Sequence, residues 1–185
     1  MNKNFEIPSD FSVSRRSLKR DELEWLYETL SSNNYNKGEN VLEFGGGVST
    51  WAVFSALNPK IYVVVENFKP AINSIKINIP DVKIVDTTWD DIPKLTYDVV
   101  FVDGSSGCPV SIVDEAKRRG VKGDVFRKEA VIYAERLQSP DAIVILHDCM
   151  HHCENWRWPK DYLEEKGYVL LAKHRTKNLR IYQGK

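Results

Sequence analysis

The feature that most constrains the fold is a regular alternation, after about residue 39, of short apolar runs with helix-length segments. The runs are dominated by valine, isoleucine, leucine and phenylalanine, which is typical of strands that helices cover on both faces. They are Asn40–Phe44, Ile61–Glu66, Val82–Val85, Asp98–Val102, Ala142–Leu146 and Tyr168–Leu171. The pattern therefore predicts a parallel sheet.

Helices are expected between these runs, which makes the chain a series of βαβ units. The expected helices are Thr50–Ala56, Pro70–Asn78, Gly123–Leu137 and Pro159–Lys166. The closing run Leu179–Tyr182 is expected to add a last, antiparallel strand. We predict an α/β fold with a doubly wound, mostly parallel seven-stranded sheet.

An N-terminal leader and helix are expected ahead of this core, over residues 1–38. Ser17 is placed to cap a helix over Leu18–Leu30, whose leucines recur at spacings compatible with one face. No repeat, low-complexity tract or flexible linker interrupts the chain. Residues 1–185 are therefore expected to form a single domain, with residues 39–185 as its core.

Charge and cysteine content exclude several classes of protein. The chain has 26 Lys plus Arg and 26 Asp plus Glu, so no net charge attracts nucleic acid or an anionic membrane. Three cysteines, an odd number, do not indicate a disulfide framework. The polar start and the lack of an apolar run of about 18–20 residues predict a cytoplasmic protein with a small substrate.

The sharpest local signal is a glycine turn, Gly45-Gly46-Gly47, between the first apolar run and a helix that begins with Ser49 and Thr50. Glycines allow positive φ and close approach of a ligand, and a helix start offers unpaired N–H groups. The turn is suited to a nucleotide-like ligand. The alternative is a tight strand-to-helix turn that binds nothing.

Glu66 ends the second apolar run and strengthens the ligand interpretation. An acid at the tip of the second strand is placed to accept hydrogen bonds from ribose hydroxyls, and Asn67 follows it at the same site. A dinucleotide enzyme would need G-x-G-x-x-G, but its third glycine position is Thr50 here. Glu43 would also repel a pyrophosphate, whereas it suits the cationic S-adenosylmethionine.

The chain resembles class I methyltransferases, which have a Rossmann-like fold. Glu43–Gly47 resembles their first motif, Glu66 their ribose-binding acid, Tyr97–Gly104 their fourth-strand motif and Ala142–Asp148 their fifth strand. Within that class the pattern is similar to small glycan methyltransferases and to catechol-type enzymes, both of which methylate oxygen. The resemblance implies S-adenosylmethionine as cofactor.

The resemblance also implies which residues bind the cofactor. They are Glu43, Gly45, Gly46, Gly47, Ser49, Thr50, Glu66, Asn67, Thr88, Trp89 and Asp103. The adenine would lie against the loop after the third strand, where Trp89 offers a face for stacking and Thr88 or Asp90 could pair with the amine. The alternative for Trp89 is a position in the core.

Asp103, His147 and Asp148 are the candidate catalytic residues, because they end two runs expected to be neighbouring strands. Methyl transfer needs the acceptor oxygen held in line and relieved of its proton. Asp103 and Asp148 could bind Mg²⁺ or Mn²⁺, or one carboxylate could act as a general base beside His147. The alternative is that both only order their loops.

Substrate contacts are expected from Arg127, which could recognise an acidic group, and from His151 and His152. The segment Ser105–Lys122 is a candidate lid. A zinc site in Cys149–Cys153 is disfavoured because no second Cys/His pair exists. The alternatives are that the basic residues around Arg127 form a solvated face and that His151 and His152 lie on an exposed loop.

Three functions stay open on these grounds. They are O-methylation of a small molecule or glycan, methylation of nitrogen or of a macromolecule, and cofactor binding without catalysis. The segment after the fourth strand, Val102–Ser106, lacks the Asn/Asp-Pro-Pro-Tyr/Phe pattern of nitrogen methylation. The first function is therefore favoured.

Overall fold

A computed structural model describes most of the chain, and its elements follow the expected order. The described residues are 5–11, 18–32, 35, 40–104, 108–118, 120, 127–147, 154–176 and 178–184, without the side chains of 116 and 154–158. The helices are α1 (Arg20–Ser32), α2 (Val48–Leu57), α3 (Lys69–Asn78), the 3₁₀ helix η1 (Trp89–Asp91), α4 (Val110–Arg118), α5 (Arg127–Ala134) and α6 (Glu154–Glu165). The strands are β1 (Asn40–Phe44), β2 (Ile61–Val65), β3 (Lys83–Val85), β4 (Tyr97–Val102), β5 (Gln138–Leu146), β6 (Val169–Lys173) and β7 (Arg180–Gln183).

The strands form one seven-stranded sheet in the order β3-β2-β1-β4-β5-β7-β6. The pairs among β1 to β5 are parallel, and β7 runs antiparallel to both β5 and β6. The predicted fold class is thereby confirmed. Because β1 lies between β2 and β4, the winding direction reverses there, and ligands of such sheets bind at this switch point.

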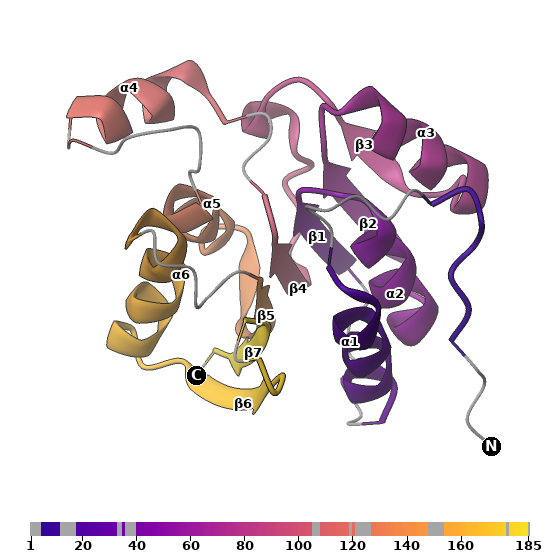
Figure 1. Ribbon diagram of the computed structural model, residues 1–185. Helices are drawn as coiled ribbons and strands as arrows, with labels where there is room; N and C mark the ends of the chain where they lie inside the picture. The colour runs from indigo at the N-terminus through magenta and orange to yellow at the C-terminus, as the bar shows by residue number, and fades with distance from the viewer. Residues whose placement is uncertain are drawn as a thin grey trace.

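Helices cover the two faces of the sheet, as Figure 1 shows. The cluster on one face joins α1, α2 and α3 to strand residues such as Val41 and Phe101. The cluster on the other face joins α5 and α6 to residues such as Leu42 and Val100. Successive strand residues belong to opposite clusters because side chains alternate across a sheet.

The start of α1 is set by a capping interaction. The backbone N–H of Lys19 donates to Oε2 of Glu22 at 3.0 Å, and the N–H of Glu22 donates to the carbonyl of Lys19 at 3.0 Å. A glutamate three residues into a helix that reaches back to the capping residue is one arm of a capping box. The expected cap, Ser17, lies outside the described residues.

Three boundaries differ from the prediction by more than two residues. α5 is described only from Arg127, and the chain turns after Ala134, where the N–H of Leu137 bonds to the carbonyl of Ala134 at 2.8 Å. β5 begins at Gln138 because Gln138 pairs with Tyr97 ahead of a register shift. Pro159 lies buried inside α6 rather than at its start, so packing offsets the backbone hydrogen bond that proline cannot make.

α4 is a further difference, because no helix was predicted within Ser105–Lys122. Ile112 and Val113 pack against the cluster shared with α5 and α6, while Val110 is 75% exposed. α4 is only nine residues long, shorter than the window of about 11–18 residues over which a helical pattern is recognised in a sequence. Among the described residues, no helix is both long enough and apolar enough to cross a bilayer.

Candidate functional site

Each glycine of the turn after β1 meets a different requirement. Gly45 has a φ of 88°, and a Cβ added there would lie 2.5 Å from the backbone nitrogen of Gly104. A Cβ at Gly46 would lie 2.3 Å from Cγ1 of Val64. A Cβ at Gly47 would meet no atom within 4 Å. Gly45 and Gly46 therefore pack the turn closely, and the backbone of Gly47 borders open space that a ligand could fill.

Glu43 lies beneath this turn and is completely buried. Ser49 Oγ donates to its Oε1 at 2.6 Å, and the Tyr62 hydroxyl donates to its Oε2 at 2.8 Å. Burial raises the pKa of Glu43 to about 7, although hydrogen bonds from Ser49, Thr50 and Tyr62 act in the opposite direction. Its carboxylate thus ties β1 to α2 and β2 rather than extending to the surface.

Thr50, the other predicted residue at the helix start, is also buried and engaged within the turn. Its hydroxyl accepts a hydrogen bond from the backbone N–H of Gly47 at 3.0 Å. Because Ser49 and Thr50 both stabilise the turn with their side chains, a ligand contact from either of them would come from the backbone.

Glu66 is held firmly at the end of β2. Its Oε1 accepts the backbone N–H groups of Asn67, at 2.8 Å, and of Phe68, at 2.7 Å. Phe68 directly precedes α3 and is 63% exposed. The sequence analysis missed Phe68; its place two residues after the predicted ribose-binding acid was the available signal.

Trp89 lies in the core, which was the second of its two predicted positions. It is completely buried, with ring centroids 5.2 Å from Phe44 and 5.5 Å from Tyr133. The Tyr133 hydroxyl donates to its carbonyl at 2.9 Å. The ring therefore offers no face to a ligand. Thr88 caps η1 by accepting the N–H of Asp90 at 3.4 Å.

A cavity of about 440 Å³ lies between η1, α4 and α5. Its apolar wall includes Pro109, Ile112 and the ring of Tyr133, and its polar groups include Asp90 and Glu129. Both the volume and the mixture of an apolar wall with a few polar groups are typical of small-molecule sites.

Asp103 and His147 meet where β4 and β5 end. His147 Nδ1 lies 2.6 Å from Asp103 Oδ1, and the two side chains are 5% and 16% exposed. The structure thus brings together two of the three predicted catalytic residues. Asp148, His151 and His152 lie outside the described residues, so their roles stay predictions.

Glu22 and Asn178 hold the other nitrogen of His147. Oε2 of Glu22 lies 3.6 Å from His147 Nε2, and Nδ2 of Asn178 lies 3.2 Å from the same atom. Burial opposes ionisation of Glu22, but contacts with His147 and the N–H of Lys19 lower its pKa to about 2. The sequence analysis missed Glu22, because nothing in its local pattern distinguishes it from a helix-capping glutamate.

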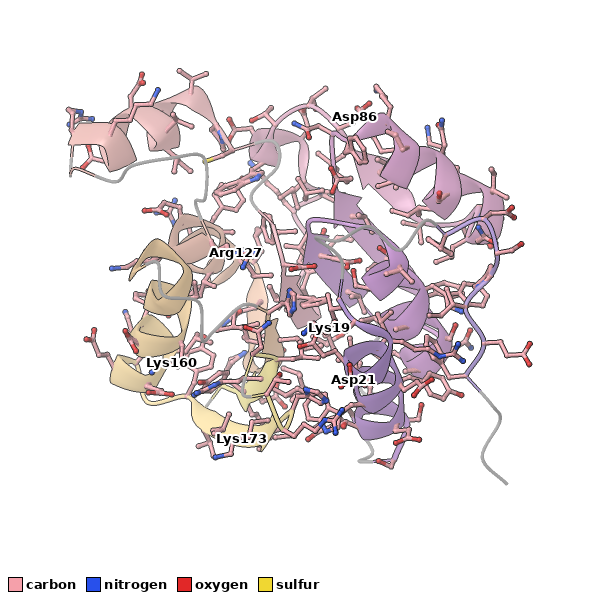
Figure 2. All side chains as sticks on the ribbon, viewed as in Figure 1. Lys19, Asp21, Asp86, Arg127, Lys160 and Lys173 are labelled. Atoms are coloured by element: carbon pink, nitrogen blue, oxygen red, sulfur yellow. The ribbon has the colours of Figure 1, made fainter. Side chains whose placement is uncertain are left out.

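Arg127 links the ends of β4 and β5. Its Nη1 donates to the carbonyl of His147 at 3.3 Å, and its Nη2 donates to the carbonyl of Asp103 and lies 3.6 Å from Asp103 Oδ1. Figure 2 shows Arg127 between α5 and the sheet. With only 8% of its side chain exposed, Arg127 organises the site from within. Recognition of an acidic substrate group by Arg127 stays a prediction.

Within the described part of the chain, no three His, Cys, Asp or Glu side chains are grouped to hold a metal ion. Of the two predicted ligands, Asp103 is described and Asp148 is not. The guanidinium of Arg127 next to Asp103 also opposes a second positive charge at that carboxylate.

Comparisons with known proteins define the fold of the chain. No family model matches the sequence, and no curated protein does so either. Among solved structures, a protein described as a caffeoyl-CoA O-methyltransferase of Staphylococcus aureus is similar, with a TM-score of 0.66 and 14% identity over 91% of this chain and 85% of the other. An O-methyltransferase of Bacillus cereus, solved with SAH, has a TM-score of 0.62 and 14% identity over 93% and 84%.

A third similar structure is a precorrin-6y C5,15-methyltransferase of Geobacter metallireducens. It has a TM-score of 0.63 and 14% identity over 97% of this chain and 96% of the other. Two of the three names specify O-methylation and the third specifies a different methylation, and at these identities the likeness establishes the fold alone. The chain therefore has the Rossmann-like fold of these methyltransferases.

Proposed function

We propose that the protein is an S-adenosylmethionine-dependent methyltransferase that methylates a hydroxyl group of a small molecule or glycan. The observation that carries the proposal is the pairing of an open glycine, Gly47, at the end of β1 with a fixed carboxylate, Glu66, at the end of β2. These strands are neighbours at the switch point of the sheet. The similar Bacillus cereus enzyme was solved with SAH, which supports the cofactor.

In this proposal the described residues would bind the cofactor as follows. The turn Gly45–Gly47 would hold the methionine part, above the buried carboxylate of Glu43, and Glu66 would accept hydrogen bonds from the ribose. At the adenine end, the exposed ring of Phe68 replaces Trp89 as the candidate for stacking, and Asp90 in the cavity could accept the amine. When bound, S-adenosylmethionine supplies an electrophilic methyl group.

Asp103 is the residue best placed to take the proton of the acceptor hydroxyl. In the described part of the chain, both charged contacts of its carboxylate are made by Oδ1, from His147 and Arg127. Oδ2 is therefore the oxygen available to the acceptor. A general base needs a fixed position within hydrogen-bond reach of the proton, and these two contacts supply it.

His147 has a different role in this proposal from the one first expected. Both of its ring nitrogens lie against protein groups, Asp103 on one side and Glu22 with Asn178 on the other. A ring held at both nitrogens orients Asp103 rather than contacting the acceptor. The proposal has three further parts. Arg127, His151 and His152 contact the substrate, residues 1–185 form one domain, and the protein is cytoplasmic.

A divalent cation held by Asp103 and Asp148 is the second candidate for activating the hydroxyl. Carboxylate oxygens suit Mg²⁺ and Mn²⁺, but the positive charge of Arg127 lies 3.6 Å from Asp103. With labelled S-adenosylmethionine and an extract of small molecules as acceptors, a chelator should leave transfer unchanged if Asp103 acts directly. Loss of transfer that Mg²⁺ or Mn²⁺ restores would favour the metal instead.

Calorimetry tests the cofactor assignment. SAH should bind the wild type, and Glu66→Ala should weaken binding by about 1–3 kcal/mol, the usual cost of losing a charged hydrogen-bond partner. Glu24→Ala is the control, because Glu24 is an exposed acid on α1 that pairs with Arg20 at 2.8 Å. Binding of NADH without binding of SAH would refute the assignment.

A further inference from the structure

The N-terminal helix contributes a buried carboxylate to the reaction centre, and this carboxylate is the least expected feature of the site. Glu22 belongs to α1, ahead of the first strand, yet it lies 3.6 Å from His147 at the end of β5. Its side chain is 3% exposed and that of His147 is 5% exposed. In Figure 2 the start of α1, marked by Lys19 and Asp21, lies close to the sheet.

Groups from two separate parts of the chain converge on Glu22 and His147. The Thr176 hydroxyl, between β6 and β7, donates to Glu22 Oε1 at 3.3 Å, and Asn178 from the same connection lies 3.2 Å from His147 Nε2. The N–H of Lys19 holds Glu22 Oε2 at 3.0 Å. Glu22 is thus fixed at both oxygens before it meets the imidazole.

We propose that Glu22 is a positioning residue of the reaction centre, which holds Nε2 of His147 so that Nδ1 is directed at Oδ1 of Asp103. The role of Asp103 as the base rests on the proposed methyltransferase function, but the positioning contact does not. An imidazole bonded at one nitrogen alone can tilt about that bond. A partner at each nitrogen fixes the plane of the ring, and through it the orientation of the Asp103 carboxylate.

The competing explanation is that Glu22 only caps α1. The two explanations are separable because glutamine serves as well as glutamate in a capping box but carries no charge. Glu22→Gln should keep the start of α1 intact and still lose the carboxylate that faces His147. Glu24→Gln is the matched control, since Glu24 lies on the same helix, is 45% exposed and pairs with Arg20, four residues before it, at 2.8 Å.

The measurement is nitrogen-15 NMR of the histidine rings in the whole protein, with the His147 signals assigned by their loss in His147→Gln. In the wild type and in Glu24→Gln, the proton on Nδ1 should resonate far downfield and exchange slowly with water. In Glu22→Gln both ring nitrogen signals should shift, and exchange of the Nδ1 proton should accelerate at least about tenfold. Backbone amide exchange at the start of α1 should stay at the wild-type rate.

Wild-type ring signals in Glu22→Gln would overturn the proposal and leave Glu22 as a cap. Should that variant not fold, Glu22→Asp provides the same decision, because it keeps the charge and a carboxylate that can cap α1 but draws that carboxylate away from His147. It should shift the ring signals in the same direction, and wild-type signals would again overturn the proposal. Calorimetry with SAH on the same proteins tests the cofactor assignment separately, because a wild type that binds no SAH leaves the NMR result standing.

Discussion

At the scale of single residues, the site depends on acids whose ionisation is set by burial and by their partners. Glu43 and Glu22 are both almost inaccessible, yet burial raises the pKa of Glu43 to about 7, whereas the contacts with His147 and Lys19 lower that of Glu22 to about 2. Hydroxyl groups surround Glu43, and Asp103 adds a like charge. The surroundings of these two glutamates therefore shift their pKa values in opposite directions.

Glu43→Gln should change how stability depends on pH. Between the ordinary pKa of 4.5 and about 7, the folded protein keeps the proton on Glu43 while the unfolded chain has lost it, so stability falls as pH rises through this window. Glutamine escapes this loss. Between pH 4.5 and pH 8, the free energy of unfolding of the variant should rise by about 3 kcal/mol relative to that of the wild type.

Denaturant unfolding of both proteins across that range measures the difference. Glu24→Gln, which removes an exposed carboxylate, is the control variant. A Glu43→Gln curve that stays parallel to that of the wild type would show that Glu43 titrates at its ordinary pKa.

At the scale of elements, α4 is a helix that forms part of the wall of the cavity. α4 lies against η1 and α5 through Pro109 and Ile112, and its charged end, Lys117 and Arg118, is exposed. Helices that pack through few apolar contacts open more readily than core elements. A ligand in the cavity would add contacts beneath α4 and hold it in place.

Trypsin cleavage after Lys117 or Arg118 should therefore slow at least about tenfold when SAH is present at one hundred times its Kd, because binding depletes the open form. Cleavage after Lys173, on the edge strand β6, should slow less and serves as an internal control. Equal slowing at both places would indicate general stabilisation rather than closure of α4.

At the scale of the whole molecule, cofactor binding should appear as stability. A ligand that binds only the folded state at one hundred times its Kd adds about 2.7 kcal/mol, which for a chain of this size raises Tm by about 5–10 °C. SAH should produce that increase and NADH should produce none. Calorimetric scans of the wild type with each compound make the comparison, and an increase with NADH alone would favour a dinucleotide enzyme.

Much of the fold could be predicted because it is encoded in local periodicity. Apolar runs such as Val99–Val102 are continuous because both faces of the sheet are covered. A glycine is required at position 45 because the turn after β1 has a positive φ there and packs against the backbone of Gly104. α4 and the early start of β5 could not be predicted, since α4 is short and held by two packing residues, and the first part of β5 depends on a register shift beside Tyr97.

The sequence by itself determined the sheet, the glycine turn and the candidate acids Glu66 and Asp103, because strand period, turn geometry and strand ends are properties of neighbouring residues. Only the tertiary structure decided that Trp89 is a core residue, that Arg127 joins two strand ends and that Glu22 reaches His147. Those outcomes depend on which elements pack together. No local pattern can specify a contact between the first helix and the end of β5 before both have been placed against the sheet.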